Sequence, residues 1–309
     1  MGKVAFVFPG QGAQQVGMGK SAFDASAAAR AVFEGADAAL GEELSKLCFE
    51  GPEDQLKLTA NTQPAVLTTS VALLRALGER PDVAAGHSLG EYTAHVCAGT
   101  LSFEDAVRTV RARGLYMQEA VPVGEGAMAA VLKLDSDAVE RICFDTEGVV
   151  EPVNYNSPGQ IVIAGAAAAV GAASAAIKSE GGRAIPLPVS APFHSSLMRP
   201  AEERLAVDLG KTTFLDPAFP VYVNVSGQPV TEAQDARLSA IRQVSRPVRW
   251  EGTVRHMLDD GVSLFVEIGP GKVLTGLIGR ISKEVRRINV QGPADFEAAC
   301  EAIAAARAA

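Results

Sequence analysis

Hydrophobic residues along the chain follow two patterns, short continuous runs and longer segments in which apolar residues recur every three or four positions. The runs at 4–8, 221–225 and 263–268 are each followed by a loop rich in Gly and Pro. Runs of this length predict strands that are buried on both faces. The longer segments predict helices at 61–77, 89–97, 103–119, 238–244 and 250–259. Strands that alternate with helices favour a mostly parallel sheet covered on both sides.

Two of these helices carry start signals. Ser102 is followed by Phe103-Glu104-Asp105, a spacing that lets the serine hydroxyl cap the free amides of the first turn. Pro64 comes early in the helix that we expect from residue 61, where its missing N–H costs no hydrogen bond. Both signals indicate helices that begin close to these residues.

The pattern changes at about residues 121–126. From there it predicts the order strand, helix, strand, strand, helix, strand, at 128–134, 136–144, 149–155, 160–164, 166–179 and 183–189. This βαββαβ order is that of the split-βαβ, or ferredoxin-like, unit. We therefore predict that residues 125–190 form a small domain inserted into a larger one made of residues 1–124 and 191–309.

Composition excludes several classes of protein. The 309 residues are 48% hydrophobic and 21% charged, as in an ordinary globular protein, and the net charge of −8 contains no long run of one sign. We therefore expect no nucleic-acid partner. The four cysteines are far apart and form no C-x-x-C pair, which argues against a metal site or a disulfide framework and for a reducing compartment. No apolar run suits a signal peptide or a membrane span, so we expect a cytoplasmic protein.

The segment Gly86-His87-Ser88-Leu89-Gly90 is the strongest candidate for chemistry. It fits G-x-S-x-G, the sharp turn between a strand and a helix that exposes a serine hydroxyl. Small residues precede it and a helical segment follows it, as that turn requires. The alternative is a Gly-rich turn without a catalytic role.

A serine nucleophile needs a base within hydrogen-bonding reach, and the chain has four histidines. His87 should point away from Ser88, His95 lies two helical turns further on, and His256 belongs to a surface-type helix. His194 is therefore the candidate base, with a structural loop histidine as the alternative. No aspartate has a motif that would make it the third member of a triad.

Two further segments contain candidates. The loop after residue 8 contains Gly10-Gln11-Gly12, but Gln15 occupies the place of the third glycine of a dinucleotide fingerprint. Gln11 is instead a candidate for a backbone N–H close to a reacting oxygen. Arg113 lies at the edge of the apolar stripe of its helix, beside Met117, which by itself favours a half-buried flank residue.

Together these segments resemble a family, the malonyl-CoA:acyl-carrier-protein transacylases of type II fatty acid synthesis, with the related acyltransferase domains of polyketide synthases. The matching segments are Phe8-Pro9-Gly10-Gln11-Gly12-Ala13-Gln14, Thr62-Gln63-Pro64-Ala65, Gly86-His87-Ser88-Leu89-Gly90-Glu91, Arg113-Gly114-Leu115-Tyr116-Met117-Gln118, Asn154-Tyr155-Asn156-Ser157-Pro158-Gly159-Gln160, Pro192-Phe193-His194-Ser195 and Glu267-Ile268-Gly269-Pro270-Gly271-Lys272. They follow the family's order along nearly the whole chain.

The resemblance implies an α/β fold, with a large α/β-hydrolase-like domain interrupted by a small ferredoxin-like one. It implies Ser88 as the acyl-accepting nucleophile and His194 as its general base. The backbone amides of Gln11 and Leu89 would form the oxyanion hole. A backbone carbonyl near Gln243 would orient the imidazole, which explains why no acidic triad member is found.

The resemblance also assigns residues to the substrate. Arg113 would pair bidentately with the malonyl carboxylate, a geometry that lysine cannot copy, and this overrides the flank interpretation. Gln63 and Asn156 occupy motif positions that line the cleft, and Met117 lies beside Arg113. Phe193, immediately before the histidine, is typical of family members that select malonyl over methylmalonyl groups.

The resemblance therefore implies transfer of a malonyl group from malonyl-CoA to the phosphopantetheine thiol of acyl carrier protein, through a malonyl-Ser88 intermediate. We expect no bound cofactor, no membrane partner and a monomer. Three alternatives stay open: a trans-acting acyltransferase of a polyketide synthase, an acyl-thioester hydrolase of the same fold, which has no need for Arg113, and a non-catalytic docking subunit for the carrier protein.

Overall fold

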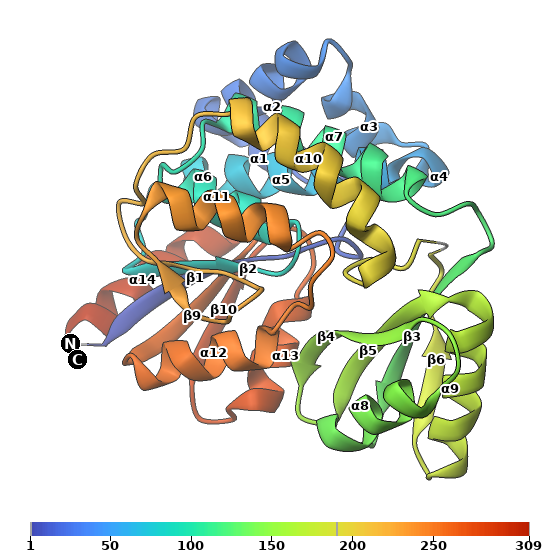
Figure 1. Cartoon of the computed structure of the whole chain (residues 1–309). Coiled ribbons are helices and arrows are strands. Elements are labelled where there is room, and N and C mark those ends of the chain that lie inside the picture. Colours follow the sequence, from blue (N-terminus) through green and yellow to red (C-terminus); the bar gives the residue numbers. More distant parts are fainter. Residues whose placement is uncertain (1, 190, 309) are drawn as a thin grey trace.

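Two β-sheets organise the chain (Figure 1). The computed structural model describes residues 2–189 and 191–308. The larger sheet has the strand order β10-β9-β1-β2-β7-β8, and all its neighbouring strands are parallel except β7 and β8. Its strands are β1 (Lys3–Phe8), β2 (Val83–Gly86), β7 (Val221–Tyr222), β8 (Pro229–Val230), β9 (Val262–Ile268) and β10 (Arg286–Val290).

Helices cover both faces of this sheet, which explains why its central strands β1 and β2 are almost entirely apolar. In β1, Val4, Phe6 and Phe8 belong to one buried cluster, and Ala5 and Val7 belong to another. In Figure 1, α1, α2, α5, α6, α7, α10 and α11 of the first cluster lie above the sheet, and α12 and α13 of the second lie below it. The helices are α1 (Lys20–Ala25), α2 (Ala27–Leu40), α3 (Leu44–Glu50), α4 (Glu53–Leu56), α5 (Thr59–Leu77), α6 (Gly90–Cys97), α7 (Phe103–Glu119), α10 (Arg199–Lys211), α11 (Ala233–Arg242), α12 (Trp250–Asp259), α13 (Val273–Ile281) and α14 (Phe296–Ala308).

The smaller sheet is antiparallel and has the strand order β4-β5-β3-β6. Its strands are β3 (Gly126–Leu132), β4 (Val150–Ser157), β5 (Gln160–Ala166) and β6 (Arg183–Pro186), and α8 (Ser136–Asp145) and α9 (Ala167–Ser179) pack on one face of it. This is the order of a ferredoxin-like unit. With the mostly parallel larger sheet, it confirms the predicted fold class. The domain boundaries at 124/125 and 190/191 stay a prediction, and residues 1, 190 and 309 lie outside the described residues.

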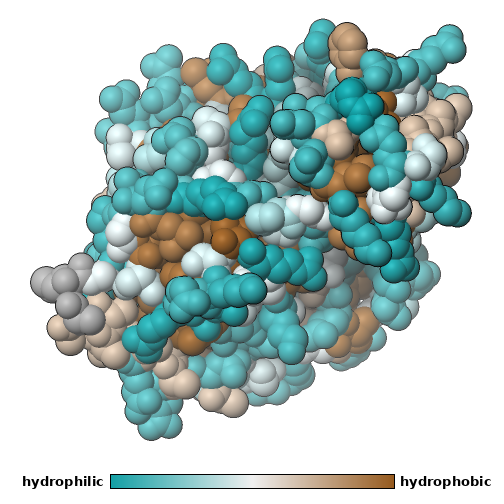
Figure 2. Space-filling model, turned by 90° about the horizontal axis from the view of Figure 1, so that it is seen from below, coloured by the Kyte–Doolittle hydropathy of each residue, from teal (hydrophilic) through white to brown (hydrophobic). Residues whose placement is uncertain are grey.

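Backbone hydrogen bonds join strand β4 of the smaller sheet to the part of the chain that contains the larger sheet. The Tyr155 amide of β4 donates to the Val248 carbonyl over 2.9 Å, and the Val248 amide donates to the Val153 carbonyl over 2.8 Å. Val248 lies in the loop before α12, so the inserted sheet is attached to the segment that leads into the lower helical layer. Seen from below, hydrophilic residues cover most of this face, and hydrophobic residues gather between two hydrophilic bands (Figure 2).

Several predicted element boundaries are wrong, among them those of β3, which spans 126–132 instead of 128–134, and of β4, which spans 150–157 instead of 149–155. Helix α5 begins at Thr59, so Pro64 lies in its second turn, and α11 spans 233–242 instead of 238–244. Strand β6 ends at Pro186 because the Val189 amide, which would have continued the pairing with β3, donates to the Leu187 carbonyl instead. Strand β7 spans only Val221–Tyr222 because the chain turns back after Val223 into the antiparallel strand β8, where the Gly227 amide donates to the Val223 carbonyl. Among the described helices, none combines the length and the apolarity that crossing a membrane requires.

Close backbone packing around Gly90 gives a test of the fold. A Cβ at Gly90 would lie 2.1 Å from the Phe8 carbonyl oxygen, so Gly90→Ala should lower the melting temperature sharply. Gly171→Ala is the matched control, because this exposed position of α9 has no atom within 4 Å of the added carbon. The control should gain about 1 kcal/mol of helix propensity and melt higher. Equal melting temperatures for the two variants would contradict the packing described here.

Candidate active site

Ser88 lies at the point where β2 ends and α6 begins. Its backbone has φ 51°, a left-handed conformation that a serine rarely adopts. A Cβ at Gly86 would lie 1.9 Å from the carbonyl carbon of Gly90, so these two positions of the turn leave no room for side chains. The sharp turn therefore needs both glycines and places the Ser88 hydroxyl above the end of β2.

His194 is the histidine that reaches Ser88. Its Nε2 lies 2.8 Å from Ser88 Oγ, and its Nδ1 lies 2.7 Å from the backbone carbonyl of Gln243. Because a carbonyl only accepts, Nδ1 carries the proton and Nε2 accepts from the serine hydroxyl. His194 comes from the segment that follows β6, and its backbone is also left-handed, with φ 65°.

The other three histidines do not reach the serine hydroxyl. His87 Nε2 lies 2.9 Å from the side-chain oxygen of Asn156. His95 is fully buried in α6, and neither of its ring nitrogens has a hydrogen-bond partner among the described residues. His256, in α12, donates from Nδ1 to the Gly227 carbonyl.

Arg113 projects from α7 into the same site, and its side chain is 1% exposed. Its Nη2 donates to Ser88 Oγ over 3.1 Å and to Gln243 Oε1 over 2.9 Å, and its Nη1 donates to Gln63 Oε1 over 2.7 Å. The interpretation of Arg113 as a half-buried flank residue is therefore wrong. Gly114 explains the burial, since a Cβ there would lie 2.8 Å from the backbone of α5 and the two helices pack closely.

All acceptors of the Arg113 guanidinium are neutral. No carboxylate lies within 4.0 Å of it among the described residues, and its Nε has no partner there. The nearest aromatic ring is that of Tyr92, 5.6 Å from the guanidinium carbon. The site thus contains a buried positive charge with an unused donor, an arrangement that favours an anionic ligand.

A cavity of about 130 Å³ lies over Ser88. Most of the predicted site residues line it: Gln11, Gln63, Ser88, Leu89, Arg113, Met117, Phe193 and His194. Two lie elsewhere. Gln243 lies behind Ser88, where its Nε2 donates to the Ser88 carbonyl over 3.0 Å, and Asn156 lines a neighbouring cavity of about 230 Å³.

The backbone amides near Ser88 differ in their partners. The Ser88 amide donates to Asn224 Oδ1 over 2.6 Å, so it is occupied. The amides of Gln11 and Leu89 make no hydrogen bond with any residue that the structure describes. The Gln11 side chain is fixed by donation to Thr59 Oγ1 over 3.2 Å. Two amides at the cavity are therefore available to an oxygen atom of a ligand.

Sequence reasoning missed Asn224. It follows a two-residue strand, and neither spacing nor composition distinguishes it from other polar loop residues. Glu91 was visible as the residue that follows the turn, but its role was not. Its carboxylate, fully buried, accepts the Asn224 amide over 2.6 Å.

Burial and charge keep the His194 imidazole neutral. Loss of hydration, followed by the positive charge of Arg113, lowers the pKa of His194 from 6.5 to about 3. The ring is therefore in its basic form at neutral pH, ready to accept a proton from Ser88.

Comparisons with known proteins identify the relatives of this chain. Residues 5–294 match the family described as Acyl transferase domain. The chain is 48% identical to the malonyl CoA-acyl carrier protein transacylase of Bacillus subtilis, over 98% of each chain. Its fold matches an acyl carrier protein S-malonyltransferase of Vibrio cholerae with a TM-score of 0.94 and 45% identity, over 96% of this chain and 99% of the other. A malonyl-transacylase solved in complex with its type II polyketide synthase acyl-carrier protein matches with a TM-score of 0.95 and 44% identity, over 97% and 99%.

The His194 environment gives a test that needs no substrate. Ser88 should react with a small sulfonyl fluoride at a rate that shows no acid limb near pH 6.5, because the His194 pKa lies well below that value. Arg113→Gln removes the nearby charge and should move the acid limb to higher pH. Arg108→Gln, on the exposed face of α7, is the matched control and should leave the profile unchanged. An acid limb at about 6.5 in the unaltered protein would contradict the electrostatic argument.

Proposed function

Because the chain belongs to the acyl transferase family, we propose that it transfers a malonyl group from malonyl-CoA to the phosphopantetheine thiol of acyl carrier protein. It is an acyltransferase, and its relatives at nearly full length are named for this reaction. The single observation that carries the choice of acyl group is the buried guanidinium of Arg113, directed at Ser88 and without a carboxylate partner within the described residues.

The proposed reaction is a two-step exchange on Ser88. Ser88 Oγ attacks the thioester carbonyl carbon and gives its proton to His194 Nε2, while the carbonyl electron pair moves onto oxygen. When the tetrahedral adduct collapses, the carbon–sulfur bond breaks and His194 returns the proton to the coenzyme A thiolate. The carrier protein thiol then attacks the malonyl-Ser88 ester, with proton transfers through His194, and Ser88 is regenerated. The 2.8 Å contact between Ser88 Oγ and His194 Nε2 supports this assignment.

We assign the oxyanion hole to the amides of Gln11 and Leu89. Both border the cavity, and neither has a partner among the described residues. The Leu89 amide also precedes the first turn of α6, where the helix dipole favours negative charge. A donor in such a position typically contributes about 3 kcal/mol to stabilising the tetrahedral adduct.

The proposed role of Arg113 is to bind the malonyl carboxylate. A carboxylate in the cavity would replace neutral acceptors with a charged one, and a charge-assisted pair of this kind is stronger than a neutral hydrogen bond. Gln63 and Gln243 hold the guanidinium in place before the substrate arrives. The buried Arg113 guanidinium weighs against a simple thioesterase, because such an enzyme would have no carboxylate to bind there. The intact Ser88–His194 pair weighs against a non-catalytic docking subunit.

Two acceptor proteins fit this proposal. We favour the acyl carrier protein of fatty acid synthesis, because the motifs of the chain resemble those of the type II fatty acid transacylases, and its relatives in Bacillus subtilis and Escherichia coli are malonyl CoA-acyl carrier protein transacylases. The similarity to a transacylase bound to a polyketide synthase carrier protein favours the alternative. The ratio of kcat/KM for the two kinds of holo carrier protein distinguishes them.

Loading of the enzyme tests the catalytic pair. Incubation with malonyl-CoA should add about 86 Da, the mass of one malonyl group that replaces a hydrogen, to the intact protein. Ser88→Ala should abolish this adduct while the protein stays folded, and His194→Ala should slow its formation by orders of magnitude. His256→Ala is the control and should load normally. Slow loading by His256→Ala with normal loading by His194→Ala would overturn the assignment of the base.

Acyl selectivity tests the binding residues. A methyl branch that meets the Phe193 ring should cost about 1–3 kcal/mol, so Phe193→Ser should admit methylmalonyl-CoA while acetyl-CoA stays a poor substrate. Arg113→Ala should slow malonyl loading sharply and narrow the preference for malonyl over acetyl, because an unpaired buried guanidinium no longer penalises the acetyl group. Initial loading rates with the three thioesters measure both effects. An unchanged rate and preference in Arg113→Ala would favour the hydrolase alternative.

A further inference from the structure

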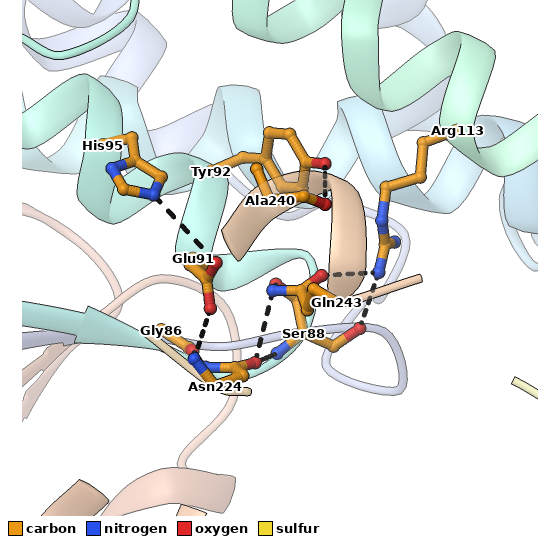
Figure 3. Close-up of polar contacts among 9 residues, drawn as sticks. All are labelled: Gly86, Ser88, Glu91, Tyr92, His95, Arg113, Asn224, Ala240 and Gln243. Atoms are coloured by element: carbon orange, nitrogen blue, oxygen red, sulfur yellow. Dashed lines mark hydrogen bonds and ion pairs between the residues drawn. The ribbon is translucent and has the colours of Figure 1, made fainter. Parts of the chain in front are cut away.

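A buried carboxylate that takes no part in the proposed chemistry lies directly behind Ser88. Glu91 is in the first turn of α6 and is 0% exposed. Its Oε2 accepts the backbone N–H of Asn224 over 2.6 Å, and its Oε1 lies 4.0 Å from His95 Nε2 (Figure 3). Burial raises the pKa of Glu91 to about 7, while the Asn224 amide, Gln243 and Arg113 lower it. A group that costs this much to bury needs an explanation beyond packing.

Asn224 connects this carboxylate to the nucleophile. Its Oδ1 accepts the Ser88 amide over 2.6 Å, and its Nδ2 donates to the Gly86 carbonyl over 2.7 Å (Figure 3). One carboxamide thus holds the backbone on both sides of His87, in the middle of the sharp turn. Gln243 adds a third contact to the turn, from its Nε2 to the Ser88 carbonyl over 3.0 Å.

The conformation of Ser88 requires such support. A non-glycine residue at φ 51° persists only where the surroundings determine it, and here the surroundings are the side chains of Asn224 and Gln243. The contact has a second effect. Since the Ser88 amide is occupied by Asn224, it does not point at the cavity, and the Leu89 amide is the one donor of the turn left for an oxyanion within the described structure.

We propose that Asn224, held in place by the Glu91 carboxylate, is a positioning residue that sets the backbone of Ser88 for attack and assigns the oxyanion to the Leu89 amide. This inference rests on the proposed role of Ser88 as the nucleophile. The contribution of Glu91 is that of a hydrogen-bond acceptor, which an amide oxygen can also supply. Glu91→Gln should therefore recover most of the activity that Glu91→Ala loses.

The experiment compares Asn224→Ala with the unaltered protein in single-turnover loading from malonyl-CoA, followed by intact mass. We expect the loading rate constant and kcat to fall by roughly 100-fold, the size typical of a misplaced reacting group, with little change in KM for malonyl-CoA. Thr93→Val is the matched control, because Thr93 is a buried residue of α6 whose hydroxyl has no partner among the described residues. It should load at the normal rate.

Each outcome separates the positioning role from a structural one. A fall in kcat with an unchanged KM in Asn224→Ala, together with recovery from Glu91→Ala to Glu91→Gln, supports the proposal. Normal loading by folded Asn224→Ala contradicts it, and so does equal loss of kcat in Glu91→Gln and Glu91→Ala. If Asn224→Ala does not fold, the two Glu91 variants alone decide. Absence of any adduct on the unaltered protein would instead contradict the proposed function itself.

Discussion

The close approach of three backbone segments at the end of β2 is the constraint on which the site depends. The Gly90 backbone lies so near the Phe8 carbonyl, and Gly86 so near Gly90, that neither glycine can carry a Cβ without a shift of the backbone. This packing requires a sharp turn, in which Ser88 takes a left-handed conformation that hydrogen bonds with Asn224 and Gln243 hold in place. The same turn brings the Leu89 amide to the cavity and starts α6 beneath it. The steric condition and these two side chains together therefore set the direction of the hydroxyl, the amide and the helix.

Charge is the second organising factor, and it acts on the imidazole through Arg113. Burial lowers the pKa of His194, and the guanidinium beside Ser88 lowers it further, so the base is neutral before the substrate binds. A malonyl carboxylate paired with Arg113 would cancel part of that charge and make His194 a stronger base when its substrate is present. An acetyl group would not do so. In the proposed mechanism, the residue that recognises the acyl group thus also adjusts the base, and selectivity should extend from binding to the chemical step.

The sequence predicted the fold class because two independent patterns agree with it: apolar runs between helices for the parallel sheet, and the βαββαβ order for the inserted one. The sequence also indicated Ser88, because Gly86 and Gly90 flank it in the G-x-S-x-G pattern. The role of Asn224 could not be predicted, because this residue lies just after the two-residue strand β7 and its side chain contacts the distant Ser88 amide. No local sequence pattern indicates such a contact. The burial of Arg113 escaped for a different reason. Helical periodicity gives the direction of a side chain, but it does not give the distance to the neighbouring helix. Here α7 and α5 pack closely because Gly114 has no side chain at their contact.

Gln243 shows how these factors are joined. Its backbone carbonyl accepts from His194, its side-chain oxygen accepts from Arg113, and its side-chain nitrogen donates to the Ser88 carbonyl. One residue at the end of α11 therefore contacts the proposed base, the arginine that is proposed to bind the malonyl carboxylate, and the proposed nucleophile. Groups that share a partner in this way do not respond independently to substitution. The effects of changes at Ser88, His194 and Arg113 should for that reason combine less than additively, and the unit that folding must assemble is the whole hydrogen-bonded group, not any one of its members.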